Sequence, residues 1–258
     1  MLFILKRIFL LLFFIPFLFS CSDDDTNNIG GSSSGPLLSQ VVMNYPNNDT
    51  FVKLYTYKDR NKLKQIDNSD GTIELYTYTD DLITKVEYLF SNSAYRDEIY
   101  YSYDSQKRLI EEIHLYYYNS SGTRTVFTHN GSGSVSYVTY SGNLGSQTEQ
   151  TYHGSFMLGA KGEILKKTET HTETGELRTY SYSFDTEKSA YLNIKDGSVG
   201  FEYILNGPNN VLSMSMKDDN GNVIYSYTST FNFNNDGYPN IEFRTSQSGT
   251  AEVHYQYK

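Results

Sequence analysis

Histidine and acidic residues are the side chains of this chain best suited to catalysis or metal binding. The nearest two histidines are 15 residues apart, so none forms the close pair that strand or helix metal sites use. No GxSxG nucleophile elbow occurs, and thiolate catalysis would require the only cysteine, Cys21. We therefore expect no catalytic constellation, no metal site and no cofactor. The histidines are His114, His129, His153, His171 and His254.

Paired acids recur along the chain, but their spacing does not suit a glycosidase. That chemistry needs two carboxylates about 5–10 Å apart across a sugar, whereas adjacent residues of a strand point to opposite faces. We interpret the pairs as turn and surface charge. Asp218 to Asn222 is similar to half of a calcium loop, but the completing Glu is missing and a plain Asn-Gly hairpin explains it. The pairs are Asp80-Asp81, Asp97-Glu98, Glu111-Glu112 and Asp218-Asp219.

Cys21 directly follows a basic and then apolar N-terminal segment. Lys6 and Arg7 precede the apolar run 8–19, which is too short for a helix that spans a bilayer. The small residue Ser20 stands before the cysteine, as at a secretory cleavage site. The segment resembles a bacterial lipoprotein signal. This resemblance implies a signal peptide at 1–20, cleavage before Cys21, and a membrane-attached lipid, such as palmitate, on its thiol.

The residues after the cysteine indicate an exported, tethered protein. Ser22, Asp23, Asp24 and Asp25 form an acidic block that resembles the export signal of surface lipoproteins in Bacteroidota-type bacteria. The alternative is a solvated acidic tether. A Gly/Ser-rich stretch follows, and such stretches behave as flexible coils. We expect a tether over 21–36, a folded domain over 37–258, and an outer-membrane, lipid-anchored location facing the cell exterior.

Composition favours strands and argues against nucleic acid. The net charge is −9, and removal of the basic signal makes the mature chain more acidic still. Nucleic-acid partners require cationic surfaces. The chain holds 25 Tyr and 15 Phe, which favour strands, and no further transmembrane segment follows the signal. Aromatic side chains must therefore supply much of the core.

The element that recurs is a pair of aromatic residues separated by one polar, uncharged residue. Residues i and i+2 of a strand share a face, so the aromatics would line one face and the small polar groups the other. Weaker copies occur at 127–129, at Tyr152 and at 201–203. The clear pairs are Tyr55/Tyr57, Tyr76/Tyr78, Tyr101/Tyr103, Tyr180/Tyr182, Tyr225/Tyr227, Phe231/Phe233 and Tyr255/Tyr257.

Each clear copy continues with a polar turn and a second alternating strand. The dipeptides Asp70-Gly71, Asn130-Gly131, Asn220-Gly221 and Asp236-Gly237 predict hairpin turns because they tolerate positive φ. The fold class is therefore all-β: an antiparallel meander of repeated hairpins that forms a curved, open or barrel-like sheet. The alternation weakens over 185–210, which predicts a long loop or a short helix; a domain boundary there is the alternative to one continuous domain.

These copies resemble the tyrosine-rich YD (RHS-like) repeats and related hairpin-repeat lipoproteins of Bacteroidota. The resemblance lies in 55–66, 101–113 and 231–243, and Tyr103-Asp104 is the YD dipeptide itself. The residue after the pair departs from Asp in the other copies. The resemblance implies a shell or barrel-like wrap of hairpins and brings no catalytic residues.

Tyr116, Tyr117 and Tyr118 are the candidate binding surface, because three consecutive aromatics must occupy both faces of a strand. We expect a non-enzymatic, surface-anchored lipoprotein with a binding or scaffold role, attached to the membrane through Cys21. Alternatives are a glycan-binding module of a surface uptake system and a carrier of lipid or another apolar ligand. A glycan or a protein would be the partner. A glycosidase or peptidase is the least favoured alternative.

Overall fold

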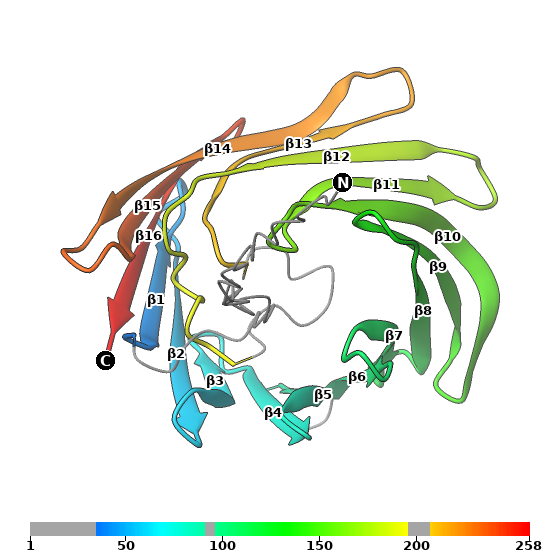
Figure 1. Ribbon diagram of the computed structural model, residues 1–258, viewed down its shortest axis with the longest axis horizontal. Coiled ribbons are helices and arrows are strands. Elements are labelled where there is room, and N and C mark those ends of the chain that lie inside the picture. Colours follow the sequence, from blue (N-terminus) through cyan, green and yellow to red (C-terminus); the bar gives the residue numbers. More distant parts are fainter. Residues whose placement is uncertain (1–34, 91–95, 196–206) are drawn as a thin grey trace, which may run out of the picture.

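The protein is a closed antiparallel barrel. The computed structural model describes residues 35–90, 96–195 and 207–258, and Figure 1 shows the strands as a ring around a central space. Each strand pairs with its neighbours in sequence, and β1 pairs with β16 to close the ring. In the described residues the strands are β1 (Leu38–Asn44), β2 (Thr50–Lys58), β3 (Lys62–Asn68), β4 (Ile73–Thr79), β5 (Leu82–Leu89), β6 (Arg96–Tyr103), β7 (Leu109–Tyr116), β8 (Ser121–His129), β9 (Ser134–Asn143), β10 (Ser146–Leu158), β11 (Ile164–His171), β12 (Leu177–Phe184), β13 (Val211–Lys217), β14 (Val223–Phe233), β15 (Pro239–Ser246) and β16 (Gly249–Tyr257).

The predicted all-β meander is confirmed, and closure into a barrel decides between its open and barrel-like forms. The aromatic pairs face the interior, as the buried Tyr55, Tyr101 and Tyr227 show. Of the seven polar residues between the paired aromatics, six are exposed and Ser226 is partly buried. The alternation of aromatic and polar residues therefore separates an aromatic inner wall from a polar outer wall. Among the described residues, none forms a helix long and apolar enough to cross a membrane.

The barrel repeats one hairpin design. In each copy, the end of an even-numbered strand pairs with the start of the strand that follows it. Tyr57 faces Leu63, Tyr103 faces Leu109, and Tyr257 faces Leu38 across the closing seam. The aligned copy on β10 is Phe156/Leu158, so Tyr152, which the sequence suggested, lies upstream of it. On β12 the register likewise places Phe184 opposite Val211. The aligned aromatic pair there is Tyr182/Phe184, two residues after the pair Tyr180/Tyr182 that the sequence suggested.

A bulge accompanies most of these hairpins, and a ring of the next hairpin contacts it. The register of β4 with β5 passes over Thr84, directly after Ile83. The hydroxyl of Tyr103, on β6, donates to the backbone oxygen of Ile83 at 2.7 Å. Tyr57 and Tyr257 make the same contact with Leu38 and Pro239, at 2.6 Å each. A bulge interrupts the ladder, and at each of these three bulges a tyrosine hydroxyl donates to a backbone oxygen.

The turn glycines follow the predicted chemistry with one exception. Gly71, Gly221 and Gly237 all have positive φ, as hairpin dipeptides require. In the turn after β8, positive φ instead falls on Ser132 and Gly133. All four turns place four or five residues between their strands, so length does not distinguish this turn from the others.

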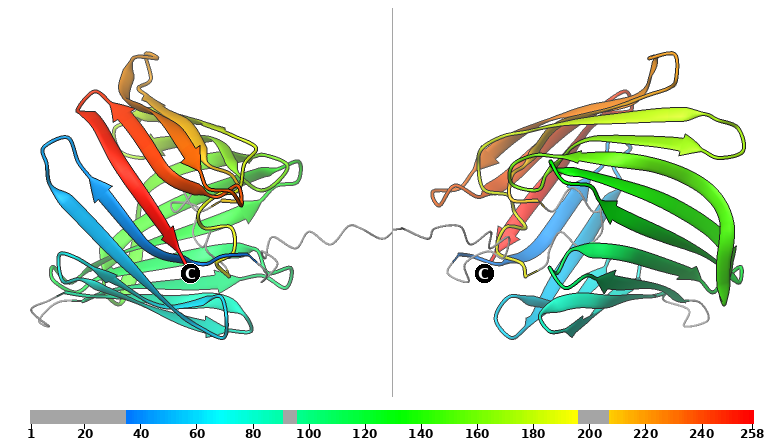
Figure 2. Two further views of the ribbon diagram at one scale, coloured as in Figure 1. Left: turned by 90° about the vertical axis from the view of Figure 1, so that its left-hand side faces the viewer. Right: turned by 45° about the vertical axis from the view of Figure 1, so that its right-hand side comes forward.

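The weakly patterned segment between β12 and β13 enters the barrel. Because β12 and β13 pair directly, the segment joins two neighbours of one sheet. Its described part, 185–195 and 207–210, forms turns and irregular structure and no helix. Figure 1 shows it in yellow inside the ring beside β2 and β3. The amide of Asn193 donates to the hydroxyl of Tyr238 at 2.9 Å and to the oxygen of Pro36 at 2.8 Å. Figure 2 shows that this end of the barrel also holds the C-terminus.

Two clusters account for most of the buried apolar residues in the part of the chain that the structure describes. One lies on the wall formed by β5 to β11 and includes Ile99, Phe127 and Tyr137. The second includes Leu38 and Val253 together with Ala190 and Ile194 from the inserted segment. The segment therefore completes the core of the β1–β3 wall, and a chamber lies beneath it.

Candidate functional site

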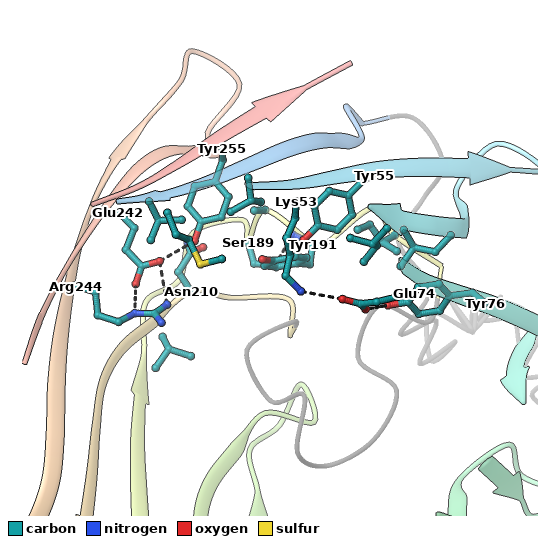
Figure 3. Close-up of a pocket in the computed structure, with 18 of the residues that line it drawn as sticks. Lys53, Tyr55, Glu74, Tyr76, Ser189, Tyr191, Asn210, Glu242, Arg244 and Tyr255 are labelled. Atoms are coloured by element: carbon teal, nitrogen blue, oxygen red, sulfur yellow. Dashed lines mark hydrogen bonds and ion pairs between the residues drawn. The ribbon is translucent and has the colours of Figure 1, made fainter. Parts of the chain in front are cut away.

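The candidate site is a chamber inside the barrel. Its cavity has a volume of about 280 Å³, close to the lower end of the range for small-molecule sites. Side chains of β1 to β5 and of β13 to β16 line the cavity. The inserted segment adds Ser189, Ala190, Tyr191 and Ile194. Most of the lining is aliphatic or aromatic, and Figure 3 shows the polar groups that project into it.

One charged cluster of the chamber centres on Glu242 of β15. The side chain is 2% exposed, and Arg244 binds both of its oxygens, at 2.8 and 3.2 Å. Ser229 donates to one oxygen and Tyr255 to the other, each at 2.7 Å. Burial opposes a charge on Arg244, yet the facing carboxylate raises the pKa of the guanidinium. The cluster is therefore an ion pair with every carboxylate oxygen hydrogen-bonded.

The second charged cluster joins β2 to β4. Glu74 is 6% exposed, and Lys53 donates to its Oε1 at 3.0 Å. Asn68 donates to the same oxygen at 3.2 Å, and Tyr76 donates to Oε2 at 2.7 Å. Figure 3 shows the two clusters on either side of Tyr191.

The tyrosines of the chamber stay protonated. Burial, and then the neighbouring Tyr191, raise the pKa of Tyr55 well above its usual value. Burial also raises the pKa of Tyr255 and Tyr76, with Tyr191 and Glu74 respectively as the next largest cause. The protonated hydroxyls of Tyr76 and Tyr255 donate hydrogen bonds to Glu74 and Glu242, and none of the three tyrosines adds a negative charge.

Sequence reasoning missed these four charged residues, although a signal was present. Lys53 and Glu74 each stand two residues before the first aromatic of a pair, so they share its inward face. Glu242 and Arg244 are likewise two apart on one strand. A charge in phase with an inward aromatic row was the indication of a polar site inside the barrel.

The predicted lipidation and export residues, Cys21 and Ser22 to Asp25, lie outside the described residues, as does the weak copy at 201–203. The structure does describe the predicted tyrosine surface, and its three rings diverge. Tyr116 packs against His114, with ring centroids 4.0 Å apart. Tyr118 is 60% exposed, whereas Tyr117 is partly buried on the outer wall.

Tyr117 belongs to a network around the carboxylate of Glu98 on the outer wall. Its hydroxyl donates to Glu98 at 2.6 Å, and the hydroxyl of Tyr100 donates to the same oxygen at 2.8 Å. The guanidinium of Arg96 lies over the Tyr117 ring, 5.0 Å from its centroid. Burial alone would raise the pKa of Glu98, but hydrogen bonds from Lys85, Tyr117 and Tyr100 outweigh it and lower the pKa to about 2. The Tyr117 ring therefore has a structural role, and Tyr118 is the most exposed of the three tyrosines.

The acidic pairs and histidines form no cluster in the described part of the chain. No group of three or more His, Cys, Asp or Glu there has a metal-binding arrangement. Asp218 accepts hydrogen bonds from the backbone of Asn220 and Asn222 at 3.0 and 2.7 Å, as in a hairpin turn. Within Asp97-Glu98, Asp97 faces inward opposite Tyr116, while Glu98 faces outward.

Comparison with known proteins supports the fold and shows no family. No family model matches the chain, and no curated protein matches it. A porin-like protein from Bacteroides vulgatus has a similar structure, with a TM-score of 0.60 and 10% identity, covering 87% of this chain and 99% of that chain. A porin-like protein from Bacteroides uniformis is 11% identical with a TM-score of 0.36, covering 81% and 78%. The TcdB2-TccC3-Cdc42 structure is 10% identical with a TM-score of 0.22, covering 82% and 14%. Only the first likeness is close enough to carry an argument, and at its low identity it shows the closed barrel fold.

Proposed function

We propose that this protein is a non-enzymatic, lipid-anchored binding protein whose barrel stands in water and holds a small ligand in its chamber. The observation that carries this proposal is the cavity lined by the inner wall and the inserted segment. Its lining is largely apolar with a few polar groups, the composition that small-molecule sites share. The acids of the chamber are ion-paired with neighbouring bases, which suits binding better than proton transfer.

The composition of the outer wall supports a barrel in water. A barrel that crosses a membrane carries an apolar band outside, flanked by aromatic girdles, and its interior is polar. Here the outer wall carries polar pairs, and the inner wall is largely aliphatic and aromatic apart from the two charged clusters. Hydroxyl pairs cross the outer wall, for example Ser155 with Thr168 at 2.9 Å and Ser183 with Ser213 at 2.6 Å. Outward-facing Arg124 and Glu111 form an ion pair at 2.6 Å on the same wall. Lipid would leave such groups without hydration, so water is the favoured surrounding.

The N-terminal sequence supports attachment to a membrane through lipid on Cys21. The described chain begins at Gly35, and Pro36 contacts the inserted segment through Asn193. The first described residues therefore lie at the end of the barrel where that segment enters. We propose the outer membrane, with the barrel facing the cell exterior, because of the acidic block after the cysteine.

The repeated hairpin supports the proposed relationship to YD-like repeats. The aromatic pair, the turn, the apolar residue and the bulge recur in a fixed order around the ring. Where the second aromatic is replaced, its role is kept: His129 lies 2.8 Å from the backbone oxygen of Leu109, where other copies place a tyrosine hydroxyl. A contact that recurs in this way gives the second tyrosine of the pair a role in the repeat.

Filling the chamber tests the proposed binding function. Met43 lines the cavity, whereas Val42, its neighbour on β1, faces outward opposite His254 of β16. We expect the barrel to bind phenylnaphthylamine, a neutral apolar fluorophore, with increased fluorescence. Met43→Trp should weaken that binding, and Val42→Trp should leave it unchanged. Native mass spectrometry of gently purified protein should also detect a bound small molecule. Equal binding by both variants, with no copurified ligand, would refute a chamber ligand.

A further inference from the structure

The carboxylates of the chamber have little hydrogen-bonding capacity left, whereas the basic groups keep unused donors. Both oxygens of Glu242 already accept two hydrogen bonds each, and the oxygens of Glu74 accept from Lys53, Asn68 and Tyr76. The two carboxylates are also almost fully covered. A ligand in the chamber would therefore find little acceptor capacity on the acids.

The bases of the same ion pairs, Arg244 and Lys53, are more exposed than the acids and have unused hydrogen-bond donors. The side chain of Arg244 is 31% exposed against 2% for its partner, and that of Lys53 is 29% exposed against 7%. Among the described residues, Arg244 donates two hydrogen bonds, both to Glu242, and Lys53 donates one, to Glu74. A guanidinium has five N–H donors and an ammonium has three. The remaining donors belong to the more exposed partner of each pair, within a chamber that these residues line.

The remainder of the lining suits an apolar body. Val41, Ile66, Val253 and Phe231 face the cavity, and the inserted segment adds Ile194. Contact with these side chains favours a ligand by removing apolar surface from water. The chamber thus combines apolar walls with positively charged donors.

We propose that the chamber binds amphiphiles that have an apolar body and an anionic oxygen head group, such as a carboxylate, which Arg244 and Lys53 recognise. This inference rests on the proposed binding function and adds the chemical class of ligand. A neutral or cationic head group cannot use the donors as well, because charge-assisted hydrogen bonds are the stronger ones.

Matched ligands test the class. Decanoate, decanol and decylamine share one apolar body and differ in head group, and each can displace phenylnaphthylamine from the barrel. Hydrogen bonds to charged groups are stronger than those between neutral groups, so decanoate should bind at least about tenfold more tightly than decanol. Decylamine should bind most weakly. Equal binding of the three, or a preference for decylamine, would overturn the proposed class.

Variants that neutralise an ion pair test the residues. Lys53→Gln with Glu74→Gln, and Arg244→Gln with Glu242→Gln, each keep the net charge, and the Glu→Gln changes also keep the side-chain shape. At least one double variant should lose the preference for decanoate while it still binds phenylnaphthylamine. Lys166→Gln, on the outer wall, is the control and should keep the preference. If both double variants retain it, Arg244 and Lys53 do not recognise the head group. If the unaltered barrel fails to bind phenylnaphthylamine, the binding function itself fails, so the two proposals are separable.

Discussion

At the scale of single residues, the main feature is charge inside an aromatic barrel. A buried ion is costly unless it is paired and its remaining hydrogen-bonding positions are filled. Glu242 meets both conditions through Arg244, Ser229 and Tyr255. An ion pair of this kind is weak evidence for stability, because hydrophobic residues often stabilise such positions more. A role in ligand binding gives a reason for its presence.

His114 makes stability depend on pH. Its Nε2 is buried and has no hydrogen-bond partner in the described structure, and burial lowers the pKa of the ring from 6.5 to about 4. Between those values the unfolded chain binds a proton that the folded chain does not, so stability is complete above pH 6.5 and falls as the pH drops toward 4. We expect a loss on the order of 1 kcal/mol, after allowance for partial exposure of the ring.

Urea unfolding at pH 7 and pH 5 measures this effect. The His114→Gln variant should lose less stability between the two pH values than the unaltered protein. An equal loss in both proteins would assign the pH dependence to other groups. His254→Gln is the control, because that ring is on the outer wall beside Glu252.

At the scale of elements, the hairpins were predictable and their bulges were not. Alternation of aromatic and polar residues sets the two faces of a strand locally, so Tyr101 and Tyr103 had to face one way and Ser102 the other. The bulge at Thr84 depends on pairing between strands, and nothing in the local sequence marks it. The inward phase of Lys53 and Glu74 could be read from the local sequence, but their pairing could not, because the two residues come from β2 and β4 and meet only in the folded barrel.

The hydroxyl contacts across the bulges should stabilise the barrel. Tyr103→Phe removes the donor to Ile83 and leaves that carbonyl without its aromatic partner. We expect a loss of about 1–2 kcal/mol in the free energy of unfolding, measured by urea denaturation. Tyr118→Phe is the matched control, because Tyr118 is 60% exposed, and it should change stability little. Equal effects of the two substitutions would contradict a role for the bulge contact.

At the scale of the whole molecule, closure and the polar outer wall decide how the protein meets a membrane. Closure leaves no exposed sheet edge, because β1 pairs with β16. Local sequence could not predict it, since strand tilt and stagger around the entire ring determine whether a barrel closes. The outer wall carries hydroxyl pairs and ion pairs, so the barrel itself should have little affinity for lipid. The proposed attachment to a membrane then rests on the N-terminal segment.

Cys21→Ala separates attachment through lipid from attachment through the barrel. Without the thiol no acyl group is added there, and the protein should move from the membrane fraction to the soluble fraction after cell lysis. The variant is expressed behind a signal peptide that an ordinary signal peptidase removes, and the mass of the mature chain verifies cleavage. Ser22→Ala, which keeps the cysteine, should stay with the membrane. A Cys21→Ala protein that resists extraction with salt and carbonate would mean that the barrel wall itself binds lipid. The outward hydroxyl pairs and ion pairs would then lie in lipid, where they lose their hydration. That result would overturn both the proposed lipid anchor and the proposed barrel in water. Release of the variant into the soluble fraction would support both proposals.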